Sequence, residues 1–426
     1  MATGAAVQLV TSVIVARRLG PAGKGLVSML TYLVALGVPV AALGTGEAAI
    51  TLVRRHGTSL ERACRASLGL LAVAAPIGVL AVAASAAGIE GLHPGDLNLV
   101  LALGATAITL PLATTFRLLS HLLDSQQRVP FTSAIQALVI VVTAVATFLA
   151  VDLLSWSVFG AMAAVATGWA AGCTILLVAL ARGGVSLKPR FDREYLHRAL
   201  RLGIPVGLST LVVVASTRLD LLLVGSLAGR AAAGQYSVST SIGSLVTYAP
   251  SALAIAAYPR LASLPDDATV ELTGRLFRVG VLAALGTALA LVALVPPAVT
   301  FVFGKAFDGA VVPALVLVGD GVVWAAQWVL CRAAAARGET RLLLWSFLSD
   351  LAVMLVLDLA LIPTYGATGA AIASTAGSLA GLSIALGFVR RGGPSAIPLR
   401  SLVPRMRDLR ELRAVAAMLA TAKPAD

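Results

Sequence analysis

Long apolar runs, each ended by charged residues, glycine or proline, dominate the sequence. Runs such as 26–53, 129–151 and 210–227 contain roughly 20 or more residues, enough for a helix to cross about 30 Å of hydrocarbon. The alternating segments of about ten residues that a membrane barrel would need are absent, so the runs predict helices. We expect twelve membrane spans, near 4–19, 25–53, 66–88, 97–121, 129–151, 156–181, 202–227, 235–258, 276–303, 309–335, 342–362 and 366–389.

The composition suits a chain surrounded by lipid rather than by water. Hydrophobic residues make up 58% of the 426 residues and charged residues only 12%, whereas about a quarter of a soluble domain is charged. The cysteines, Cys64, Cys173 and Cys331, are far apart and form no CxxC pair, and the four histidines form no ligand cluster. We therefore expect no disulfide framework, no metal site and no cofactor.

Basic residues are distributed unevenly between alternate loops. If the N-terminus faces the cytoplasm, 26 of the 32 Lys and Arg residues fall on the cytoplasmic side, five on the outer side and Arg218 inside a span. Cytoplasmic loops of membrane proteins are enriched in Lys and Arg. We expect a multi-pass protein of the cell (cytoplasmic) membrane with both termini in the cytoplasm. The net charge of +12 then reflects this topology and anionic lipid, not nucleic acid.

The two halves of the chain resemble each other. A shift of 209 residues pairs Gly20 with Gly229, Gly25 with Gly234 and Arg128 with Arg337. The same shift superposes a small residue at every fourth position of the sixth and twelfth spans, placing Gly160, Ala164, Gly168 and Gly172 on Gly369, Ala373, Gly377 and Gly381. Chance matching in a Gly- and Ala-rich chain is the alternative explanation. We interpret the small residues as a face for close helix packing.

An internal repeat of six spans fixes the expected architecture. Because six is even, both halves enter and leave the membrane on the same side, which predicts a pseudo-two-fold axis along the membrane normal. The predicted fold is an all-α integral membrane protein with two six-helix lobes, 1–181 and 202–389. Segment 182–201 is predicted to be a basic cytoplasmic linker and 390–426 a basic cytoplasmic tail. Within that tail, 402–419 has the spacing of a helix lying on anionic lipid, a disordered tail being the alternative.

Several short motifs carry a family resemblance. They are ARRLGP at 16–21 followed by Gly25, DLLLVG at 220–225 followed by Gly234 and Tyr236, FGKAF at 303–307, ARGE at 336–339 and IPTYGATGAA at 362–371. In this order the motifs resemble the polysaccharide and O-antigen flippase family (lipopolysaccharide biosynthesis membrane proteins). This family belongs to the multidrug/oligosaccharidyl-lipid/polysaccharide (MOP) exporter superfamily. The resemblance covers nearly the whole chain.

The resemblance implies a MATE-like carrier without catalytic residues. Such a carrier moves lipid-linked oligosaccharide or polysaccharide intermediates to the outer leaflet by alternating access, for cell-surface polysaccharide biosynthesis. The implied partners are a glycan on a polyprenyl diphosphate lipid, membrane lipids, a polysaccharide polymerase and glycosyltransferases. A cation- or proton-coupled multidrug exporter of the same superfamily is the alternative. A membrane-embedded glycosyltransferase or ligase would need acidic or metal-binding residues in large outer loops, and apart from 90–96 the expected outer loops are short.

Cations near or inside the spans are the first candidates for binding a lipid diphosphate, because that anion must cross an apolar layer. Arg218 lies inside the seventh span, where a charge pair with another helix or snorkelling is the alternative role. Arg17 and Arg18 end the first span, and Arg54 and Arg55 end the second. Interface anchoring and the positive-inside rule are the alternative explanations for these four.

Acidic residues inside the spans are candidates for coupling transport to a cation or proton. Asp220, Asp320 and Glu47 are of this kind, with a structural hydrogen bond as the alternative. On the fourth span, polar side chains recur at i, i+4, i+7 and i+11, namely Arg117, His121, Asp124 and Arg128. This stripe predicts either a salt-bridged gate that includes Arg117 or a solvated helix end.

Overall fold

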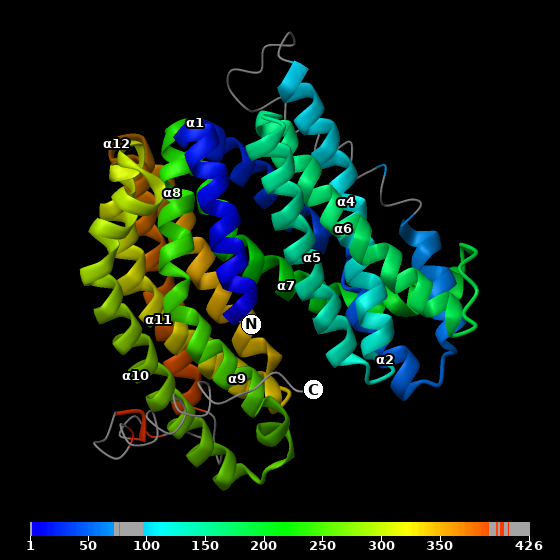
Figure 1. The fold of residues 1–426 in the computed structure, drawn as a ribbon. Coiled ribbons are helices and arrows are strands. Elements are labelled where there is room, and N and C mark those ends of the chain that lie inside the picture. Colours follow the sequence, from blue (N-terminus) through cyan, green and yellow to red (C-terminus); the bar gives the residue numbers. More distant parts are fainter. Residues whose placement is uncertain are drawn as a thin grey trace. The chain divides into compact units, whose positions relative to one another are not determined.

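The computed structural model describes residues 2–71, 76, 97–391, 398, 401–403 and 408, and these residues form helices and connecting turns without a strand (Figure 1). The predicted all-α fold is confirmed. The chain divides into two compact units, Met1–Ser237 and Val238–Asp426. The predicted outer loop 90–96 lies outside the described residues, as does most of the predicted tail helix.

Unit 1 contains the helices from the N-terminus to the start of α8. They are α1 (Ala2–Ala42), α2 (Thr45–Arg55), a helical segment at 60–71, α4 (Leu97–Asp124), α5 (Val129–Thr147) with the π-helical turn η1 (Phe148–Leu153), α6 (Ser157–Arg182), α7 (Arg193–Leu227) and the first part of α8 (Arg230–Gly243). Unit 2 contains the rest of α8, α9 (Leu245–Ser263), α10 (Asp266–Ala298), η2 (Val299–Phe303), η3 (Lys305–Ala310), α11 (Val311–Ala336) and α12 (Thr340–Arg391).

Most of the predicted spans have a helical counterpart. Eight described helices are long and apolar enough to cross a membrane, or nine if α8 and α9 form one bent span. Both α1 and α12 contain a glycine with non-helical backbone angles, Gly20 and Gly366, and each therefore joins two predicted spans. Counted this way, the described helices match eleven of the twelve predictions. The remaining span, 66–88, is described only at 66–71 and 76.

Repeat-equivalent glycines meet where α1 crosses α8. Gly20 and Gly229 have φ angles of 66° and 89°, values that favour glycine, and each directly precedes a helical stretch. Five residues later, Gly25 and Gly234 touch through their backbones. A Cβ on Gly25 would lie 1.8 Å from the carbonyl oxygen of Arg230, and a Cβ on Gly234 would lie 1.9 Å from that of Pro21. Of the two repeat pairs found in the sequence, Gly25 and Gly234 thus form a reciprocal backbone contact, and Gly20 and Gly229 precede the helical stretches that carry it.

From this crossing, α1 and α7 pack antiparallel along their length. Met29 of α1 fills the space beside Gly225 of α7, and Gly44 at the end of α1 meets Gly203 and Gly207. A Cβ on Gly44 would lie 2.0 Å from the Gly203 carbonyl oxygen. We call this line of contacts, from Gly25 to Gly44, the α1–α7 seam. Lipid supplies no hydrophobic drive between helices, so close backbone packing of this kind is a main source of their association.

Two spans predicted as continuous helices are broken, which corrects the sequence analysis. The span 25–53 ends as α1 and resumes as α2, because Leu43 and Gly44 both have positive φ angles. The span 235–258 bends by 45° between α8 and α9. At this bend the hydroxyls of Ser244 and Thr247 bond backbone carbonyls three residues earlier, and such bonds compete with the helical ladder.

The small-residue faces of α6 and α12 pack as predicted. A Cβ on Gly168 would lie 2.0 Å from Thr143 Oγ1 of α5, and one on Gly172 would lie 2.5 Å from a methyl of Val139. In unit 2, Gly377 approaches Asp350 and Gly381 approaches Gln327 and Ser346 just as closely. The interpretation of these faces as close packing is confirmed.

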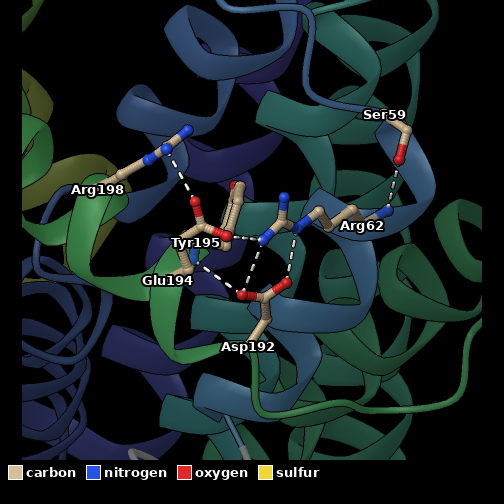
Figure 2. A network of polar contacts seen from close by, with 6 residues as sticks. All are labelled: Ser59, Arg62, Asp192, Glu194, Tyr195 and Arg198. Carbon is tan, nitrogen blue, oxygen red and sulfur yellow. Dashed lines mark hydrogen bonds and ion pairs between the residues drawn. The ribbon is translucent and has the colours of Figure 1, made fainter.

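A polar network fixes the start of α7 to the segment after α2 (Figure 2). Arg62 Nε lies 2.6 Å from Asp192 Oδ2, and Arg62 Nη2 lies 2.8 Å from Glu194 Oε2. Asp192 also caps α7 by accepting a bond of 2.9 Å from the N–H of Tyr195. Beside this network, the N–H of Arg190 bonds the carbonyl of Arg65. The end of the predicted linker is thus attached to unit 1.

The backbone contact at Gly234 should not tolerate even one methyl group. We expect Gly234→Ala to lower the midpoint temperature of thermal unfolding of the detergent-purified protein, because the new Cβ would collide with the Pro21 carbonyl. The matched control is Gly104→Ala in α4, where a Cβ meets nothing within 4 Å. In an open helical position, Gly→Ala stabilises by about 0.5–1 kcal/mol. Equal stability of the two variants would show that the contact is not tight.

The Arg62–Asp192 pair should stabilise the protein at neutral pH and lose its effect in strong acid. The hydrogen bond from Arg62, helped by the Tyr195 N–H, lowers the pKa of Asp192 from its ordinary 3.8 to about 2. A carboxylate with a lowered pKa stabilises the folded state fully above its unfolded value, and the effect disappears as the pH falls through about 2.

The measurement is the difference in unfolding temperature between wild type and Asp192→Asn. This difference should be equal at pH 6 and pH 8 and should shrink as the pH falls from 4 towards 2. Because the Arg62 side chain is 43% exposed, we expect an effect of about 1 kcal/mol or less. A difference that changes between pH 6 and pH 8 would contradict this assignment.

Candidate functional site

Arg218 lies on the α1–α7 seam, inside an apolar part of α7. Its guanidinium carbon is 4.5 Å from the ring centroid of Tyr32 of α1, close enough for a cation–π interaction. Arg218 is nevertheless exposed on the surface of the chain. An arginine on a membrane helix normally faces a bundle interior or a wet cavity, where it remains hydrated. The position is therefore suited to meeting an anionic solute.

Lys24 is a second cation on the same seam, and the sequence analysis missed its role. It lies in the first turn after the break at Gly20, beside Gly25, and only 8% of it is exposed. Within the part of the chain that the structure describes, its amine has no hydrogen bond or ion pair. A buried charge without a partner is costly. A helix start also carries partial positive charge, so this place favours an anion.

Asp220 lies in a different setting from the neighbouring Arg218. It is 5% exposed, and its Oδ2 accepts a bond of 2.5 Å from the Tyr236 hydroxyl of α8. Its Oδ1 accepts a bond of 2.7 Å from the N–H of Leu221. The Tyr236 bond holds α8 against α7, close to the crossing at Gly234. A coupling role for Asp220 stays a prediction.

Glu47 and Arg117, predicted separately, form one ion pair between α2 and α4. Arg117 Nη2 donates to Glu47 Oε1 at 2.9 Å, and His121 Nε2 lies 3.7 Å from the same oxygen. The two paired side chains are 23% and 34% exposed. Further along α4, Asp124 accepts a bond from the Thr132 hydroxyl of α5. The polar stripe of α4 is therefore engaged with neighbouring helices over at least part of its length.

The four arginines at helix ends have varied surroundings. Arg18 is paired with Asp152 of η1, and Arg54 donates to the carbonyl of Ser125 at 2.9 Å. Arg17 and Arg55 are exposed on α1 and α2. Arg18 thus connects α1 to η1, and Arg54 connects α2 to the turn after α4. Substrate binding by any of the four stays a prediction.

In unit 2, Asp320 is half-buried on α11. It begins a line of side chains that includes Trp324 and Trp328, one helical turn apart. Within unit 2, this line of side chains combines a carboxylate with two indole rings. Among the described residues, no group of His, Cys, Asp or Glu could hold a metal ion.

Sequence reasoning missed Lys24 because it assigned this residue to an outer loop between two spans. The structure extends the second of those helices back to Pro21, so Lys24 lies on a helix. A signal was available in the sequence, since proline after glycine is typical of a helix start and Gly20-Pro21 precedes Lys24 by three residues.

Comparisons with known proteins agree with this membrane architecture. The family model described as "Polysaccharide biosynthesis protein" matches residues 14–312. No curated protein matches the chain by sequence.

Among solved structures, "Lipid II flippase MurJ, inward closed conformation" superposes with a TM-score of 0.71 at 12% identity, covering 99% of this chain and 92% of that one. A multidrug resistance MATE family transporter of the MOP superfamily, in an inward-facing conformation, superposes with a TM-score of 0.67 at 15% identity. The match covers 98% of this chain and 96% of that one. The MATE multidrug transporter DinF-BH superposes with a TM-score of 0.67 at 17% identity, covering 92% of this chain and 93% of that one. At these identities the likeness establishes the fold.

The Glu47–Arg117 pair should contribute measurably to stability. We expect Glu47→Gln to destabilise the protein by about 1–3 kcal/mol, because it leaves the partly buried guanidinium of Arg117 with a weaker partner. The matched control is Glu271→Gln, at an exposed position of α10. Thermal unfolding in detergent provides the measurement. If Glu47→Gln unfolds like Glu271→Gln, the ion pair is not a stabilising contact.

Proposed function

The chain belongs to the polysaccharide biosynthesis protein family, and from this we propose that it is a flippase for lipid-linked glycans. It is a multi-pass membrane transporter with the fold of the MOP superfamily, and not an enzyme. Its proposed cargo is an oligosaccharide or polysaccharide intermediate on a polyprenyl diphosphate. Transport would proceed by alternating access across the cytoplasmic membrane.

The observation that carries this proposal is the pair of cations on the membrane helices of unit 1. Lys24 is buried without a partner among the described residues, and Arg218 is exposed over Tyr32. Placing a cation on a membrane helix costs free energy, so such a residue is a candidate for a functional role. Both cations suit the diphosphate of a lipid carrier, because hydrogen bonds between charged partners are about twice as strong as neutral ones.

A cation- or proton-coupled multidrug exporter is the second candidate function. Asp320 on α11 favours it, because a carboxylate inside a membrane helix can bind a proton or a cation. The positive charge of Lys24 argues against a cationic cargo in its vicinity, since like charges repel. The solved MATE structures above share the fold with this chain, but at their low identity they do not decide the cargo.

The test is flipping of a fluorescent undecaprenyl-diphosphate-linked sugar in proteoliposomes, with empty vesicles as background. We expect wild type to flip the lipid, and Lys24→Gln and Arg218→Gln each to flip it at least about tenfold more slowly. The reason is that a hydrogen bond to a charged group is worth about 1.5–3 kcal/mol. Lys24→Arg should retain activity, because it keeps the positive charge.

The matched control is Lys305→Gln, which removes a charge at an exposed position of η3. It should flip at the wild-type rate. Wild type that does no better than empty vesicles with several linked sugars, yet extrudes cationic dyes, would replace the flippase proposal with the exporter. If wild type flips the lipid and both Lys24→Gln and Arg218→Gln flip it equally fast, neither cation belongs to the binding site.

A further inference from the structure

One face of α11 carries an unusual set of side chains for a membrane helix. Asp320, Trp324, Trp328 and Arg332 follow one another at intervals of four residues and lie on one side of the helix. All four are half-buried, whereas Gly321, Ala325, Ala326 and Val329 between them are buried. We call these four half-buried residues the α11 stripe. Over twelve residues the stripe extends about 18 Å along the helix.

The aromatic rings of the stripe are held in a defined arrangement within unit 2. The Trp324 and Trp328 rings stack, with centroids 5.1 Å apart and planes 14° apart. Phe347 of α12 packs edge-on against both, at 6.5 and 6.1 Å. The Arg332 guanidinium lies 5.1 Å from the Trp328 ring and 5.2 Å from the Tyr258 ring of α9. Residues from three helices therefore position the stripe.

The stripe also contains hydrogen-bond donors that the described protein does not satisfy. The Nε1 atoms of Trp324 and Trp328 and the Nε atom of Arg332 are buried, and none has a hydrogen-bond partner among the described residues. An indole and a guanidinium can only donate. In the interior of a membrane protein, each unsatisfied donor costs free energy. Three such donors on one helix face indicate a ligand that is rich in acceptor oxygens.

We infer that the α11 stripe binds the sugar units of the transported glycan. A sugar ring has an apolar face of C–H groups, which can lie against an indole, and a rim of hydroxyl oxygens, which accept from N–H donors. The Asp320 carboxylate can accept from a sugar hydroxyl. This inference rests on the proposed function and extends it from the diphosphate to the glycan.

The geometry favours a neutral or acidic glycan over a cationic aromatic solute. A cationic aromatic solute could stack on the same indoles. However, the positively charged guanidinium of Arg332 lies over Trp328 and would repel it. The donor nitrogens are covered by protein in this structure, so a ligand reaches them after a ring rotates. Stacking between Trp324 and Trp328 should therefore change when a glycan binds.

The experiment measures lipid binding rather than flipping, using full-length protein in detergent. The probes are fluorescent undecaprenyl diphosphates that carry N-acetylglucosamine, glucose or galactose, and the same lipid without sugar. Anisotropy gives the dissociation constant of each. We expect wild type to bind at least one sugar-linked lipid about tenfold more tightly than the sugar-free lipid, a difference of about 1.4 kcal/mol, because the sugar adds a stacked ring and a hydrogen bond.

The variants separate stacking from hydrogen bonding. Trp328→Leu removes both and should abolish the preference for the sugar-linked lipid, whereas Trp328→Phe keeps a ring and should retain part of it. The matched control, Trp345→Leu, removes a tryptophan that is 56% exposed on α12 and should leave the preference unchanged. Binding of the sugar-free lipid should be unaffected in all three variants, which also shows that they are folded.

Two outcomes would overturn the inference alone. One is a sugar preference that persists in Trp328→Leu, and the other is a wild type that binds sugar-linked and sugar-free lipids equally well. If wild type binds none of these lipids but binds a cationic rhodamine dye, and Trp328→Leu loses that binding, the stripe belongs to an exporter. In that case the proposed function fails as well, and the flipping assay would fail with it.

Discussion

The close backbone contact along the α1–α7 seam is the constraint on which the rest of unit 1 depends. At Gly25 and Gly234, and again at Gly44 with Gly203 and Gly207, two backbone segments touch where any side chain would collide. Helices in lipid gain nothing from hiding apolar surface from each other, so their association relies on such close contact and on polar bonds. The seam fixes the place of Tyr32 under Arg218 and leaves Lys24 in the turn next to the crossing. The bond from Tyr236 to Asp220 secures the same crossing from α8.

Because lipid cannot solvate charge, the partner of each ionisable group indicates its role. Glu47 and Arg117 pair with each other, Arg18 pairs with Asp152 of η1, and Arg54 donates to the carbonyl of Ser125. These contacts account for the charges in structural terms. Lys24 has no such contact among the described residues, and Arg218 lies over an aromatic face while remaining exposed. A buried charge whose cost is not offset within the protein, or an exposed one on a membrane helix, is one that a ligand can stabilise. This distinction selects Lys24 for the proposed site, whereas Arg218 is proposed because it is exposed on an apolar stretch of α7.

The sequence allowed accurate prediction of features that repeat or that extend over many residues. The spans follow from apolar length. A single shift along the sequence pairs Gly25 with Gly234, which are in backbone contact in the structure. Local breaks were not predicted, because positive φ at Leu43 and hydroxyl bonds at Ser244 do not interrupt an apolar run. The pairing of Glu47 with Arg117 was missed because the two residues are 70 positions apart. Lys24 was misplaced because polarity alone suggested a loop.

The two units offer different chemistry to an amphipathic ligand. Unit 1 presents single cations on α1 and α7, which suit a compact anion such as a diphosphate. Unit 2 presents stacked indoles and several donors along α11, which suit a larger, weakly charged and hydroxyl-rich group. A lipid-linked glycan contains both kinds of group in one molecule, whereas a small cationic drug contains neither. On the proposed function, the diphosphate is the group that suits Lys24 in unit 1, and the sugars are the groups that suit the unsatisfied donors of α11 in unit 2.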